Sequence, residues 1–119
     1  MLFMKRYRIR SYEMGLLFRD GEFQGLVEAG TRWFFDPFGK VQINVVSQRE
    51  PWLVNEKLDL IVKSGLLSDP AVVLDLKDHE RALVWIENRF SHILPAGLYA
   101  YWTGQKNVRV EVIDARNVR

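Results

Sequence analysis

Polar and apolar residues alternate in several short stretches of this 119-residue chain. In residues 7–11, Tyr7 and Ile9 alternate with polar residues, and in residues 108–112 three valines alternate with charged residues. A period of two places successive side chains on opposite faces of a β-strand. These stretches are therefore predicted to be half-buried strands, each with one face toward a core and the other toward water.

The strands fall into two copies of one pattern. Residues 13–35 align with residues 80–102 without a gap, at an offset of 67 positions. The 39 pairs between residues 12–50 and residues 79–117 contain eight identities, whereas average residue usage gives roughly two or three by chance. The chain is therefore predicted to be a duplication of one β unit.

Turn residues separate the strands at matching places in the two copies. Asp20-Gly21 lies between two apolar runs, which is a strong signal for a type I′ hairpin. Glu87-Asn88 occupies the same place in the second copy, and asparagine also tolerates the left-handed backbone conformation. With the other turns included, each copy comprises about five short strands.

The connector between the copies, residues 51–71, carries two patterns. Asn55, Leu58, Ile61 and Gly65 fit a capped amphipathic helix, whereas apolar residues at every second position from Leu58 fit a strand. We expect a mainly β fold in one compact domain over residues 1–119. It contains two related five-strand units, at about 5–50 and 72–117, with a short helix between them as one interpretation of the connector.

Composition limits the class of protein. Hydrophobic residues make up 48% of the chain and aromatic residues 13%, which is enough for a core at this length. The absence of cysteine excludes a disulfide scaffold and a thiolate zinc site. No run of about 20 apolar residues predicts a transmembrane helix, and the start of the chain lacks the apolar region of a signal peptide. The net charge of +2 does not by itself imply a nucleic-acid or lipid partner.

One acidic cluster with a histidine is a candidate for metal or acid–base chemistry: Asp75, Asp78, His79 and Glu80. On a strand His79 points away from Asp78 and Glu80, and only the glutamate recurs in the first copy, so we interpret these residues as solvated charges. No phosphate loop or nucleophile elbow is present. We therefore expect no enzyme activity, no catalytic residue, no metal and no cofactor.

A basic ladder marks the first predicted strand, where Arg6, Arg8 and Arg10 share one face. Such a face is able to bind anionic lipid or nucleic-acid phosphate. More often it belongs to a solvated edge strand that charge protects from aggregation, and we favour that interpretation.

Two charged positions recur in both copies and are also candidates for interaction: Glu13 with Glu80, and Arg49 with Arg116. They would form either a contact between copies or subunits, or an ion pair that closes the first and last strands of each unit. We favour the ion pair within a unit.

Two strands are rich in aromatic residues, namely Trp33, Phe34, Phe35, Tyr99, Tyr101 and Trp102. Exposed aromatic side chains stack on the bases of single-stranded nucleic acid. We favour a role in the core and in the contact between the two units, because a five-strand unit alone is marginal in size.

In its recurring charges and turn residues the chain resembles the stomatin/prohibitin superfamily, also called SPFH or band 7. It is most similar to the N-terminal region of bacterial slipins. The shared features in the first copy are Glu13, Asp20-Gly21, Gly30, Asp36-Pro37 and Arg49. In the second copy they are Glu80, Glu87-Asn88, Pro95, Gly97 and Asp114-Ala115-Arg116.

The resemblance implies a scaffold, self-assembly or protein-interaction module of a slipin-like, membrane-associated protein. Expected partners are the chain itself or the rest of a longer slipin-like chain, with a membrane protease or anionic lipid as further partners and no nucleic acid. The alternative is a small peptide- or lipid-binding β module at a membrane surface.

Family members usually carry a membrane segment, a full SPFH domain and a long helical region, none of which is recognised here. We therefore expect a module of a longer protein, located in the cytoplasm and peripheral at the inner membrane through flanking segments that this chain lacks. Strand edges such as residues 7–11 or 108–116 are expected to pair between subunits.

Overall fold

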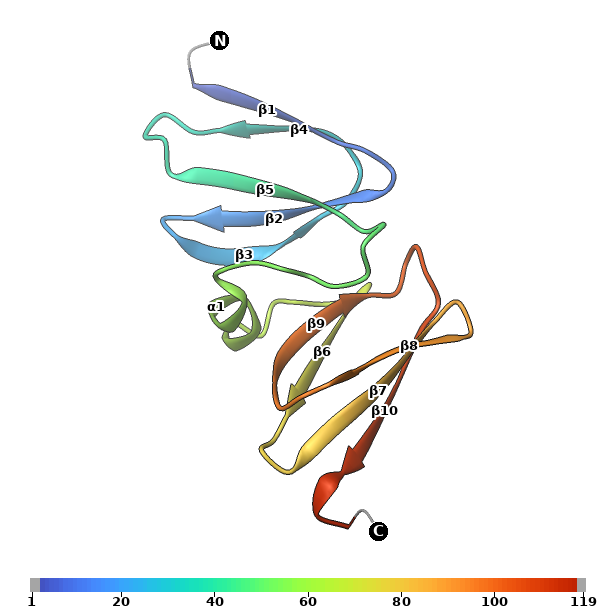
Figure 1. The fold of residues 1–119 in the computed structure, drawn as a ribbon. Helices are drawn as coiled ribbons and strands as arrows, with labels where there is room; N and C mark the ends of the chain where they lie inside the picture. Colours follow the sequence, from blue (N-terminus) through green and yellow to red (C-terminus); the bar gives the residue numbers. More distant parts are fainter. Residues whose placement is uncertain (1–2, 118–119) are drawn as a thin grey trace.

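The computed structural model describes residues 3–117, and its fold is mainly β, as the alternation predicts (Figure 1). The strands of the first unit are β1 (Met4–Ile9), β2 (Glu13–Arg19), β3 (Glu22–Val27), β4 (Gly30–Phe35) and β5 (Val41–Ser47). Those of the second are β6 (Ala71–Leu76), β7 (Glu80–Ile86), β8 (Arg89–Leu94), β9 (Gly97–Trp102) and β10 (Val108–Asp114), followed by the short 3-10 helix η1 (Ala115–Asn117). Every strand of the second unit begins and ends 67 positions after its counterpart.

Each unit folds into two antiparallel sheets with the same connections. In the first unit β1 pairs with β4, and β2 lies between β3 and β5. In the second unit β6 pairs with β9, and β7 lies between β8 and β10. A β-bulge follows Leu17 in the pairing of β2 with β3, and another follows Val84 in the pairing of β7 with β8. A bulge bends its strand and increases the local twist, so both hairpins curve at the same place.

The two predicted hairpins have the backbone conformation that a type I′ turn requires. The φ angles are 54° at Asp20 and 79° at Gly21 in the first unit, and 53° at Glu87 and 64° at Asn88 in the second. Positive φ at both central residues matches the twist of the flanking strands. The prediction is confirmed in both copies, although only the first has a glycine in the turn.

The connector forms the helix α1 (Leu58–Lys63), so the helical interpretation is confirmed and the strand interpretation is wrong. Ile61 is fully buried, and Gly65 follows the helix with a φ of 73°, as expected at a helix end. Asn55 does not cap the helix. Its side-chain oxygen instead accepts a hydrogen bond from the backbone N–H of Lys57, 2.8 Å away, because the helix begins two residues later than predicted.

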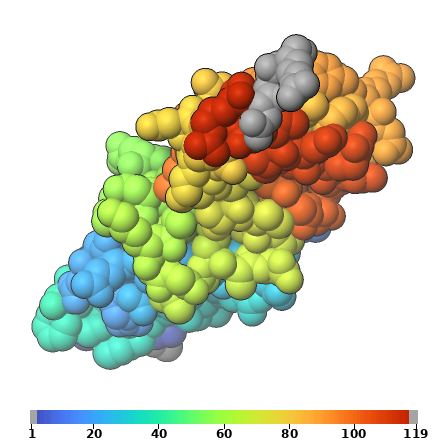
Figure 2. All heavy atoms as spheres, turned by 90° about the horizontal axis from the view of Figure 1, so that it is seen from below, coloured from blue at the N-terminus to red at the C-terminus, as the bar shows by residue number. Residues whose placement is uncertain are grey.

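Most of the buried hydrophobic residues among residues 3–117 fall in two clusters. The larger one joins Leu16 and Phe18 of the first unit to Ile61 of α1 and to Ala100 and Trp102 of the second. The smaller one lies within the second unit, around Leu76, Ala82, Val84 and Leu94. The units lie end to end with the connector between them, which gives an elongated molecule of 64 × 26 × 17 Å (Figures 1 and 2).

The expectation that both aromatic strands are buried between the units is wrong for β4. Trp102 of β9 is fully buried in the shared core, whereas its counterpart Phe35 is 64% exposed and Trp33 is 59% exposed. In the end-to-end arrangement β9 lies near the junction and β4 lies toward the far end of the first unit (Figure 1). Equivalent strands therefore meet different surroundings.

Candidate functional site

The most distinctive surface of the molecule is one face of the β1–β4 sheet. The antiparallel register sets Met4 opposite Phe35, Arg6 opposite Trp33 and Arg8 opposite Thr31. Residues directly opposite each other project from the same face of a sheet, and all six of these side chains are exposed. We call these residues the basic–aromatic face: Met4, Arg6, Arg8, Thr31, Trp33 and Phe35.

Asp36 anchors the end of this face at which Met4 lies opposite Phe35. Its carboxylate forms an ion pair with the Nζ of Lys5 at 2.9 Å and accepts hydrogen bonds from the backbone N–H groups of Lys40, at 2.7 Å, and Val41, at 3.1 Å. The hydrogen bond from Lys5, supported by those from the backbone, lowers the pKa of Asp36 to about 2. The same hydrogen bond raises the pKa of Lys5. The turn after β4 is therefore tied to β1 and β5.

Two further exposed aromatic residues, Phe3 and Phe38, lie close in the chain to the Met4–Phe35 end of the basic–aromatic face. Phe38 is 81% exposed in the turn between β4 and β5, and Phe3 packs edge-on against Phe35 with ring centroids 6.2 Å apart. An exposed apolar patch bordered by polar residues is typical of an interaction site.

A cleft lined by polar and apolar groups lies at the other end of the same face, near Arg8 and Thr31. It has a volume of about 630 Å³, and Arg8, Arg10, Ser11, Tyr12 and Thr31 contribute to its walls. The guanidinium of Arg49 lies over the ring of Tyr12, 3.8 Å from the centroid. The cleft thus combines guanidinium and hydroxyl groups, which are suitable hydrogen-bond donors to phosphate oxygens.

Two of the candidate residues, Arg8 and Arg10, line this cleft, and Arg6 lies on the same face of β1 as Arg8. Arg49 contacts the ring of Tyr12, which also lines the cleft. Sequence reasoning considered Trp33 and Phe35 as exposed stacking residues but favoured a place for them in the core. The sequence did contain a signal, because successive side chains of a strand point to opposite faces. Only every second side chain of this strand is therefore expected to be buried. Which of the two faces is open depends on the packing of the units.

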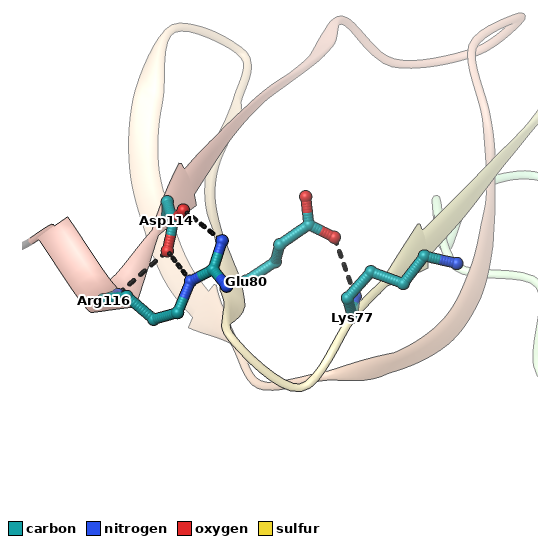
Figure 3. A network of polar contacts seen from close by, with 4 residues as sticks. All are labelled: Lys77, Glu80, Asp114 and Arg116. Atoms are coloured by element: carbon teal, nitrogen blue, oxygen red, sulfur yellow. Dashed lines mark hydrogen bonds and ion pairs between the residues drawn. The ribbon is translucent and has the colours of Figure 1, made fainter.

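The recurring glutamates close turns and do not form the expected ion pairs with the recurring arginines. The Oε1 atom of Glu13 accepts a hydrogen bond from the backbone N–H of Arg10 at 2.9 Å, and that of Glu80 accepts one from Lys77 at 2.8 Å (Figure 3). In both copies the backbone N–H of the glutamate returns a hydrogen bond across the same turn. The carboxylate therefore recurs because it fits this turn.

Arg116 pairs with Asp114, two residues before it. The Nη2 atom of Arg116 lies 3.0 Å from Oδ2 of Asp114, and its backbone N–H donates to Oδ1 of the same residue at 2.9 Å (Figure 3). The side-chain hydrogen bond to Asp114 is the main cause of the raised pKa of Arg116, and the charge of Glu80 adds a smaller effect. In the first copy the backbone N–H of Arg49 donates to the hydroxyl of Ser47, the counterpart of Asp114.

The acidic cluster with a histidine does not converge. Among residues 3–117 no group of three or more His, Asp or Glu side chains lies close enough to hold a metal ion. His92 is hydrogen-bonded through Nδ1 to the hydroxyl of Ser91 at 2.7 Å, and its ring contacts Trp52, with centroids 5.5 Å apart.

An apolar cavity of about 300 Å³ lies between the connector and the second unit. Trp52, Leu58, His92, Leu94 and Tyr99 are among the residues that line it. Its size suits one large side chain, but it lacks the charged groups that would select a particular ligand.

Comparisons with known protein families, with curated proteins and with solved structures find no match for this chain. Within the described part of the chain, no helix has both the length and the apolar character needed to cross a membrane.

Proposed function

We propose that this chain is a non-enzymatic interaction module that docks on an anionic membrane surface through the basic–aromatic face. The observation that carries the proposal is the register of β1 and β4, which sets Arg6 opposite Trp33 on one exposed surface. Anionic headgroups attract arginine, and aromatic side chains favour the boundary between headgroups and acyl chains. Phe38 is a further exposed aromatic side chain in the turn after β4.

The duplicated fold does not require this face. At the positions of Trp33 and Phe35 the second unit has the buried residues Ala100 and Trp102. At the positions of Arg6 and Arg8 it has Val73 and Asp75. Because the same strand pair forms with such different side chains, the combination of arginine and exposed tryptophan is a property of the first unit alone.

The magnitude of the expected attraction follows from the number of cations. Each arginine or lysine close to an anionic surface contributes about 1 kcal/mol, so Arg6, Arg8 and Arg10 together change the partition coefficient on the order of 100-fold. The Debye length is about 10 Å at 0.1 M salt and about 3 Å at 1 M, so high salt should abolish most of this effect.

Co-sedimentation with vesicles tests the proposal. The protein should bind vesicles of phosphatidylcholine with phosphatidylglycerol and should bind pure phosphatidylcholine much more weakly. The triple variant with Arg6→Ser, Arg8→Ser and Arg10→Ser should lose most of the binding. The double variant Trp33→Ser with Phe35→Ser should weaken it roughly tenfold or more, since the apolar contribution is removed.

A matched control removes the same charge elsewhere. Arg19, Lys63 and Arg89 are exposed residues outside the basic–aromatic face, and their replacement by serine should leave most of the vesicle binding intact. Equal loss in the two triple variants would mean that net charge alone drives binding and would overturn the proposal. Binding to single-stranded RNA of mixed sequence without binding to either vesicle would also overturn it.

Self-assembly into a scaffold, as expected from the slipin resemblance, is a second candidate function. It is favoured by the open sheet edges, since β8 and β10 each pair with β7 alone among the strands in residues 3–117. Sedimentation velocity over a wide concentration range tests it, and a strict monomer at the highest concentration would contradict it.

A further inference from the structure

β10 is an edge strand whose outward backbone groups can be assigned. The backbone N–H of Glu87 donates to the carbonyl of Asn107, and that of Ala115 donates to the carbonyl of His79. Both pairs continue the register of β7 with β10. Hydrogen-bonded pairs alternate along an antiparallel ladder. The odd-numbered residues of β10 therefore bond to β7, and Val108, Val110 and Val112 direct their N–H and C=O groups to the open edge.

The residues around this edge are self-complementary. The sequence Val108-Arg109-Val110-Glu111-Val112 has charges of opposite sign at equal distances on either side of Val110. A twofold axis at Val110 sets Arg109 opposite Glu111 of a second copy, and Val108 opposite Val112. An axis at Arg109 or Glu111 would instead set like charges opposite each other, which destabilises a sheet.

We propose that two copies of this chain associate through β10, antiparallel and centred on Val110, so that the two three-stranded sheets become one continuous sheet. This contact rests on the self-assembly function proposed above and names its partner as a second copy. About six backbone hydrogen bonds form across the axis, from the outward groups of the three valines. Arg109 and Glu111 fall at non-hydrogen-bonded positions, where opposite side chains lie closest.

The exposure of the side chains agrees with this contact. Arg109 and Glu111 are both exposed, and Val112 is exposed although it is a valine in a strand. The guanidinium of Arg109 lies over the ring of Trp85 on β7, 3.9 Å from the centroid, so it must turn toward the open edge to meet Glu111 of a second copy. Val112 would gain cover from Val108 of the second copy, so the contact buries an apolar side chain that is open to water in one copy.

Two other edge strands, β1 and β5, are less suited to the same pairing. β1 carries only positive charge, at Lys5, Arg6 and Arg8, so two copies of it repel each other. β5 is the counterpart of β10, but Gln42 and Asn44 replace the charged pair. β10 also lies at the opposite end of the molecule from β1 (Figure 1). Pairing at β10 therefore leaves the basic–aromatic face open.

A single introduced cysteine tests the register, because the chain has no cysteine of its own. In Val110→Cys the two Cα atoms lie roughly 5.5 Å apart across the axis, within the range of a disulfide. Mild oxidation should therefore give a covalent dimer on a non-reducing gel. In Val112→Cys the two Cα atoms are offset by about 13 Å, too far for a disulfide, although this position is the more exposed.

A charge swap tests the chemistry of the contact. Arg109→Glu or Glu111→Arg sets like charges opposite each other twice in each dimer, and each should raise the Kd measured by sedimentation roughly tenfold or more. The double variant restores both pairs with reversed sign and should return the Kd to within about threefold of the unmodified protein. Gln42→Glu on β5 is the control and should leave the Kd unchanged.

The outcomes separate this contact from self-assembly in general. A strictly monomeric protein overturns both. A dimer that the charge variants do not weaken, and in which Val110→Cys crosslinks no better than Val112→Cys, overturns the β10 contact and leaves self-assembly through another surface. Recovery in the double variant together with selective crosslinking at Val110 establishes the contact.

Discussion

Ile61 is the residue through which α1 joins the two units, and its truncation should destabilise the whole chain. The side chain is fully buried in the cluster that contains residues from both units. Burial of an isoleucine contributes about 1.5–3 kcal/mol, and the cavity left by alanine adds to the loss, so Ile61→Ala should lower the free energy of unfolding by about 2–5 kcal/mol. Ile61→Val should cost only about 0.5–1.5 kcal/mol.

Urea denaturation followed by circular dichroism measures this change. With a urea dependence of about 2 kcal/mol per molar for a small protein, the midpoint of Ile61→Ala should fall by roughly 1–2.5 M. Leu60 is the matched control, since it lies next to Ile61 on the same helix but is 54% exposed. Leu60→Ala should change stability by about 0.5 kcal/mol or less. Equal losses in the two alanine variants would refute the assignment of Ile61 to a shared core.

Three further predictions concern turns, close packing and pH. Asn88→Ala should lower the free energy of unfolding by about 1 kcal/mol, because alanine is strained at a φ of 64°, whereas Asn88→Gly should not; thermal unfolding of both variants compares them. Gly15→Ala should cost about 1–3 kcal/mol in urea, because its Cβ would lie 2.9 Å from Cδ1 of Ile9, and unchanged stability would contradict this packing. Asp36 has a pKa lowered to about 2 from its ordinary value of 3.8, so its contribution is present above pH 4 and is lost as the pH falls toward 2. Asp36→Asn should therefore be less stable than the unmodified protein at pH 6, with a smaller difference at pH 2, and an equal difference at both pH values would refute this role.

The candidate site was predictable only in part. The alternation of polar and apolar residues correctly placed Arg6 and Arg8 on one exposed side of a strand, whereas Arg10 lies just beyond the end of β1. The pairing of that strand with β4 joins residues about 30 positions apart, and no local pattern sets which strand lies beside it. The arginines were therefore identified without the aromatic side chains that lie opposite them.

The recurring charges illustrate a different limit. Recurrence of Glu13 at Glu80 correctly marked a position with a specific role, but the role was assigned to a distant arginine. The carboxylate instead accepts a hydrogen bond from a backbone N–H three residues earlier. Sequence comparison detects that a polar group is required, whereas the identity of its partner depends on the local path of the backbone.

The sequence by itself indicated the strands, the two hairpins and the duplication, because side-chain period and turn conformation are properties of neighbouring residues, and it left a helix and a strand as alternatives for the connector. Only the tertiary structure decided that the units lie end to end, that Trp102 is buried while Phe35 is exposed, and that β10 has an open edge. The physical reason is that burial depends on which surfaces meet across long separations in the chain. Two copies of one pattern therefore fold alike and yet present different faces to water and to partners.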